Sequence, residues 1–88
     1  MALYLVERYI PSTSRGRLAE DAARTTRVAR EMTGTGTPVR HVWSTFLPSE
    51  EACLSLFEAP DPLAVEEVNR RAGLTFDRIV EAVSVLGL

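Results

Sequence analysis

The sequence predicts an α+β fold in which two helices cover one face of a four-stranded antiparallel sheet. Three observations predict it. Four short runs are rich in β-branched, aromatic and aliphatic residues, two longer stretches have helical features, and these elements follow the order strand-helix-strand-strand-helix-strand. With 45% hydrophobic and 25% charged residues, we expect the chain to form a single domain over residues 1–88.

The first strand and the first helix are expected in the N-terminal third. Residues 3–10 (LYLVERYI) have the composition of a strand, which Pro11 ends. Over residues 17–32, side chains that suit a buried helical face recur at steps of three and four: Leu18, Ala22, Thr25, Ala29 and Met32. Gly34 suits the left-handed position after a helix and Pro38 cannot continue one, so the helix is expected to end here.

The middle of the chain is expected to form a hairpin. Residues 39–47 and 52–59 are rich in aromatic and aliphatic residues, and the polar stretch 48–51 between them is short. A hairpin with Leu47 opposite Ala52 follows from this spacing.

A second helix and a fourth strand complete the order. Asp61 is a good N-cap and Pro62 suits the first helical position, so the helix is expected to begin here and to end near Gly73. Residues 78–86 (RIVEAVSVL) predict the fourth strand. The compact solution for this order is a ferredoxin-like βαββαβ sandwich, with strand order 4-1-3-2 and both helices on one face.

The other face of the sheet is expected to be open and to carry the candidate ligand-binding residues. Alternate residues of a strand share a face, and this alternation groups the following polar and aromatic side chains among aliphatic ones: Glu7, His41, Trp43, Glu58 and Glu81. The complementary set is mostly small and apolar, and we assign it to the helices.

Two pairs within this set suggest chemistry. His41 opposite Glu58 would act as a general base or as a weak metal site, or would be an ordinary cross-strand pair. Glu7 and Glu81, on neighbouring antiparallel strands, would share a proton, or each would be solvated or paired with Arg8 or Arg78. One histidine per chain supplies few nitrogen ligands for a transition metal. A dimer or additional carboxylates would therefore have to complete the coordination shell of the ion.

Composition excludes several classes of function. The net charge of -2 does not suit a nucleic-acid-binding protein, and no apolar run has the roughly 20 residues that a membrane helix needs. No signal peptide is visible, and a lone cysteine, Cys53, is expected to be reduced, so we expect a cytoplasmic protein.

Three segments resemble a bacterial family of small domains of unknown function, sometimes called nickel-binding-protein-like. They are Leu5-Val-Glu-Arg8, Glu58-Ala-Pro60 before the second helix, and the Arg-Ala-Gly-Leu run at 71–74. The resemblance implies a ferredoxin-like fold, a homodimer, and nickel as a candidate ion.

Three functions remain open at this point. The first is a homodimer that binds a small ligand or a metal ion on the open face. The second is a cofactor-independent enzyme of monooxygenase or isomerase type, with its pocket on that face in a dimeric α+β barrel. The third is a structural or regulatory dimer without a small-molecule site, with Trp43 as an interface anchor.

Overall fold

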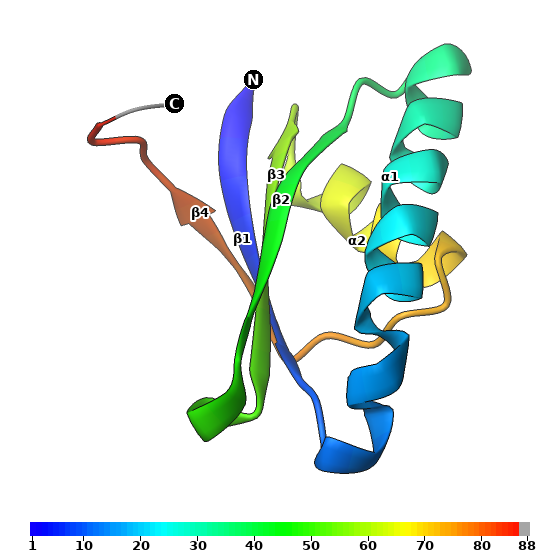
Figure 1. Cartoon of the computed structure of the whole chain (residues 1–88). Helices are drawn as coiled ribbons and strands as arrows, with labels where there is room; N and C mark the ends of the chain where they lie inside the picture. Colours follow the sequence, from blue (N-terminus) through cyan, green and yellow to red (C-terminus); the bar gives the residue numbers. More distant parts are fainter. Residues whose placement is uncertain (87–88) are drawn as a thin grey trace.

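The computed structural model, which describes residues 1–86, confirms the predicted fold class and strand order. Its strands are β1 (Ala2–Tyr9), β2 (Arg40–Leu47), β3 (Ala52–Ala59) and β4 (Arg78–Ala82), its α-helices are α1 (Leu18–Gly34) and α2 (Pro62–Arg71), and its 3-10 segments are η1 (Ser12–Arg17) and η2 (Pro48–Glu50). The sheet is antiparallel in the order β2-β3-β1-β4, and α1 and α2 lie on the same side of it (Figure 1).

Strand β4 is shorter than predicted. It ends at Ala82, whose partner is Leu3, and β1 itself begins only one residue earlier, at Ala2. The segment that follows therefore has almost no neighbouring strand to pair with, and Val83 and Val85 are 80% and 96% exposed. The apolar composition of residues 83–86 predicted a strand that the length of β1 does not allow.

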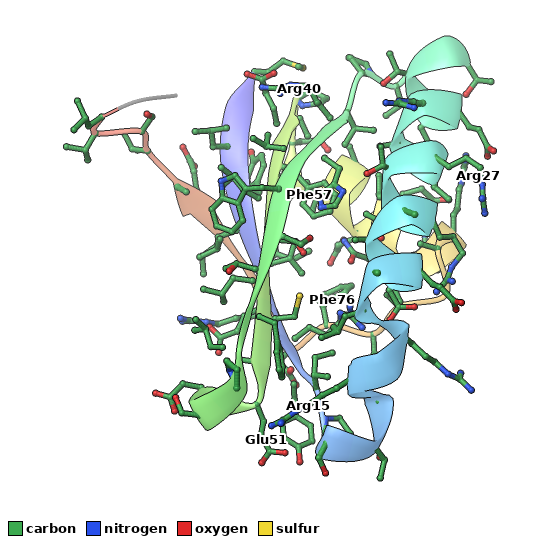
Figure 2. All side chains as sticks on the ribbon, in the orientation of Figure 1. Arg15, Arg27, Arg40, Glu51, Phe57 and Phe76 are labelled. Atoms are coloured by element: carbon green, nitrogen blue, oxygen red, sulfur yellow. The ribbon has the colours of Figure 1, made fainter. Side chains whose placement is uncertain are left out.

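The core lies between the sheet and the two helices. Phe57 of β3 is fully buried and lies on the helix side of the sheet (Figure 2). Val65 and Val68 of α2 are likewise fully buried, and the side chain of Val6 in β1 is only 1% exposed. Helix α1 contributes three apolar side chains to the core, of which sequence periodicity predicted two: Val28, Ala29 and Met32.

The ends of the helices follow local chemistry. Asp61 caps α2 as predicted, since its Oδ1 accepts a hydrogen bond from the backbone N–H of Ala64 at 2.9 Å. Gly73 has a left-handed backbone with φ of 75°, also as predicted. Helix α1 instead includes Gly34, and Gly36 takes the positive φ of 107°. Within residues 1–86, neither helix combines the length and the hydropathy needed to cross a bilayer.

Candidate functional site

Three of the five predicted site residues lie on the open face of the sheet. Trp43 of β2 pairs with Leu56 of β3, which pairs with Leu5 of β1, so these three side chains share the face opposite the helices. Glu7 and Glu58 lie on the same face by the same alternation.

The two acids on the open face each pair with an arginine. Arg78 Nε lies 3.2 Å from Glu7 Oε2, and Arg40 Nε lies 3.3 Å from Glu58 Oε1. Glu7 and Glu58 are separated along the β3 ladder, since Glu7 pairs with Leu54 and Glu58 itself is four residues further on. The charge of each carboxylate is therefore balanced by its own arginine, and the two carboxylates do not form a single cluster.

His41 lies on the other face, and the predicted pair with Glu58 is wrong. The hairpin begins in the expected register, with Leu47 opposite Ala52, but a β-bulge between His41 and Trp43 inserts Val42 as an extra residue. His41 consequently pairs with Phe57 and points toward α1, while Trp43 keeps its place on the open face. Arg40 takes the position opposite Glu58.

Glu81 is also on the helix side, so the predicted approach of Glu7 and Glu81 is wrong. Strand β4 pairs Ile79 with Val6 and Glu81 with Tyr4, and both of these β1 residues face the helices. The position opposite Glu7 belongs to Arg78, which forms the ion pair with it.

The imidazole of His41 forms part of a chain of polar side chains that connects α1 to the sheet. Its Nδ1 lies 2.8 Å from Thr26 Oγ1, its Nε2 lies 2.7 Å from Ser44 Oγ, and that hydroxyl lies 2.6 Å from Ser55 Oγ. The ring also stacks on Phe57, with centroids 5.1 Å apart. Both nitrogens are therefore engaged, and the ring is held as a structural link between helix and hairpin.

This placement makes the stability of the fold depend on pH. Burial lowers the pKa of His41, and a hydrogen bond with the backbone of Trp43 opposes that shift in part. The unfolded chain therefore binds this proton more readily than the folded chain. We expect the free energy of unfolding to be highest above the ordinary histidine pKa of about 6.5 and to fall as the pH drops below it.

Urea unfolding between pH 8 and pH 5 measures this slope, and the His41→Gln variant is the control. The chain has one histidine, so the variant removes the group that titrates near neutrality. A wild-type protein that shows the same slope as His41→Gln would contradict the assignment.

The described part of a single chain does not provide a set of side chains that could hold a metal ion. Within residues 1–86, no three His, Cys, Asp or Glu side chains come together as a ligand group. Cys53 is buried, and the imidazole of His41 is committed to two hydroxyl groups. The weak metal pair predicted from His41 and Glu58 is split between the two faces of the sheet.

Sequence reasoning missed a hollow of about 220 Å³ between α1 and the β2–β3 hairpin, called here the α1 hollow. Its walls include Arg8, Leu18, Ala22, Ser44, Phe46 and Ser55. The signal that points to it is Arg8, an arginine in the alternating set of β1 that also contains Tyr4 and Val6 and that otherwise faces the core. A charged residue in such a set indicates a polar feature beneath the helices.

Comparisons with known proteins agree with this fold. A family model described as "Nickel responsive protein SCO4226-like" matches residues 4–82. The crystal structure of SCO4226 from Streptomyces coelicolor A3(2) is similar with a TM-score of 0.78, covering 99% of this chain and 100% of that chain at 20% sequence identity. At this identity the structural likeness concerns the fold alone. No curated protein matches the chain.

Proposed function

The chain belongs to the SCO4226-like family of nickel responsive proteins. On this basis we propose that it is a homodimeric binding protein, in which the open sheet face of one chain packs against the open sheet face of the other. The single observation that carries the proposal is the uncovered apolar face of the sheet. Both helices lie on the opposite side (Figure 1), so this face has no cover from within the described chain.

The open face has the composition of an interface. Aliphatic side chains occupy adjacent positions across three strands, and all of them are partly exposed except Leu56, which is buried: Leu3, Leu5, Leu54, Leu56 and Val80. Trp43 is 39% exposed beside them. A continuous apolar patch of this kind marks an interaction surface, and a partly exposed tryptophan is a frequent anchor in such surfaces.

A second copy of the same chain is the occupant that this face favours. The ion pairs Arg78–Glu7 and Arg40–Glu58 lie among the apolar residues and carry no net charge, so two identical faces meet without like-charge repulsion. A two-fold pair uses the same patch on both chains, as most soluble homodimers do. An 88-residue chain also has a small core, to which pairing would add buried area.

The ligand of this dimer is proposed to be nickel, held by side chains from both chains. One described chain supplies no complete ligand group. Glu58 and Glu7 are the carboxylates on the face that pairs, and a two-fold axis would double each of them. Each would bind the ion with the oxygen that its arginine leaves free, or in exchange for that arginine. Ligands contributed by two chains make nickel binding depend on the dimer.

Nickel titration by calorimetry, together with light scattering on a sizing column, tests the proposal. A chain of 9.7 kDa should elute with about twice that mass and should bind nickel. The monomeric variant Leu5→Glu, described in the Discussion, should lose nickel binding, and Glu58→Gln should weaken it by roughly ten-fold or more. Nickel binding of unchanged strength in the monomer would overturn the shared site.

A dimer that gives no heat with nickel would instead favour the structural or regulatory alternative, which the same apolar face supports. The enzymatic alternative needs a pocket on the open face. The α1 hollow and a second hollow lined by Thr26, Arg30 and His41 both lie on the helix side, so no observation on residues 1–86 favours that version.

A further inference from the structure

The side chain of Arg8 is a largely buried cation on the helix side of the sheet. Arg8 belongs to β1, pairs with Cys53 of β3, and has a side chain that is only 13% exposed. Removing a guanidinium group from water costs free energy unless an anion and hydrogen-bond acceptors replace the water. The surroundings of Arg8 therefore indicate what this position is built to hold.

The acid closest to Arg8 is shared with another arginine. Asp21 Oδ2 lies 3.7 Å from Arg8 Nη1, which is beyond hydrogen-bond distance, whereas Asp21 Oδ1 accepts a hydrogen bond from Arg24 Nη2 at 2.8 Å. Arg24 also donates from Nε to the carbonyl of Ala72 at 2.6 Å, which fixes its position. Among residues 1–86, the guanidinium of Arg8 thus has one distant and already occupied carboxylate as its ion-pair partner.

A third arginine adds to the positive charge. Arg8, Arg17, Arg24 and Asp21 together line a hollow of about 300 Å³, called here the arginine hollow. Arg8 and Arg24 lie within ion-pair distance of Asp21, and the exposed Arg17 lines the same hollow, so three positive charges face one carboxylate there. Such an excess attracts an anion, and an arginine fork matches a carboxylate in a bidentate geometry.

The arginine hollow adjoins the α1 hollow, because Arg8 and Leu74 line both. The α1 hollow is mainly apolar on the side of Leu18, Ala22 and Phe46. A ligand that fits both spaces has a negatively charged group at one end and an apolar body at the other.

We propose that the two hollows form one binding site for a small organic carboxylate, with the carboxylate on Arg8 and its apolar part against Leu18, Ala22 and Phe46. The site lies beneath α1, on the opposite side of the sheet from the proposed dimer interface. It is therefore independent of pairing and of nickel.

Benzoate is the probe, and benzyl alcohol is its uncharged counterpart. Calorimetry at constant ionic strength, with chloride as the balancing salt, should detect benzoate binding to the wild-type chain. Benzyl alcohol should bind at least roughly ten-fold more weakly, because it lacks the charge that Arg8 meets. Equal affinities for the two compounds would overturn the proposal.

Arg8→Gln should weaken benzoate binding by roughly ten-fold to a hundred-fold. The matched control is Arg27→Gln, which removes the same charge from the outer surface of α1, where Arg27 points away from the sheet (Figure 2). Retention of wild-type affinity by Arg8→Gln, or an equal loss in Arg27→Gln, would overturn the site.

A second variant keeps the test decisive if Arg8→Gln fails to fold. Ala22→Leu occupies the apolar part of the α1 hollow and leaves the three arginines in place, so it should also weaken benzoate binding by roughly ten-fold. Inorganic phosphate and benzoate should differ in their response to this variant, since phosphate does not need the apolar space. If Ala22→Leu leaves benzoate affinity unchanged, the proposed orientation of the ligand is wrong.

Discussion

Replacing Phe57 with alanine is expected to destabilise the fold by about 3–5 kcal/mol, the usual cost of truncating a fully buried aromatic side chain. Phe57 is the largest side chain with no exposed surface, and it lies at the centre of the layer between sheet and helices. Its ring also stacks on His41 at 5.1 Å, so the truncation would loosen the link from the hairpin to α1. The loss of buried apolar surface and the loss of ring stacking both lower the free energy of unfolding.

That loss is a large share of the 5–15 kcal/mol that stabilises a typical domain, so the variant should be partly unfolded at room temperature or close to it. Urea unfolding followed by circular dichroism measures the change. Leu63→Ala is the control, because Leu63 on α2 is 70% exposed and its truncation should change stability by no more than about 0.5 kcal/mol. Similar losses in the two variants would contradict the placement of the core.

The second large effect is expected from Leu5→Glu, which should convert the proposed dimer into a monomer. Leu5 lies on the open face between Leu56 of β3 and Val80 of β4. Two copies of this patch related by a two-fold axis would bring a carboxylate from each chain into an apolar interface. A charge buried there without a partner costs several kcal/mol, whereas the isolated chain leaves the same carboxylate in contact with water.

Light scattering on a sizing column measures this change as a halving of mass, and circular dichroism establishes that the variant folds. Ala23→Glu places the same charge on an exposed position of α1 and should leave the mass of the dimer unchanged. A wild-type chain that is monomeric at high micromolar concentration, or a Leu5→Glu variant that remains dimeric, would argue against the open face as the interface.

Most of the fold was predictable because its signals are local. The composition of β3 and the cap formed by Asp61 depend on residues adjacent in the chain, and the structure places β3 over Ala52–Ala59 as predicted. In β1 and β3, the alternate set that carries the acids Glu7 and Glu58 was assigned to the open face, and Val6 and Phe57 of the other set lie under the helices as expected. The order of elements then leaves few compact topologies.

The arrangement of the candidate site was not predictable to the same degree, because it depends on register. A single extra residue in β2, Val42, sends His41 and Trp43 to opposite faces. In β4, Ile79 and Val80 are both apolar, so alternation carries no information on which of them faces the core. The phase of β4 is set instead by its pairing with β1, which brings Arg78 rather than Glu81 to Glu7.

Arg8 illustrates a signal that was present in the sequence and that pattern alone could not interpret. Its position two residues after Val6, in the alternating set of β1 that faces the core, placed a cation under the helices. Whether such a cation is fully paired or free to meet a ligand depends on residues distant in sequence, here Asp21 and Arg24.

The two outer strands of the sheet limit how the protein can assemble. Strand β4 has five residues, and β2 carries both the bulge at Val42 and the charged side chain of Arg40. Edge strands that are short, bulged or charged are poor templates for the addition of another strand. Growth of the sheet sideways into a continuous ribbon is therefore disfavoured, whereas the proposed two-fold pairing of the open faces would close after two copies instead of propagating into a fibre.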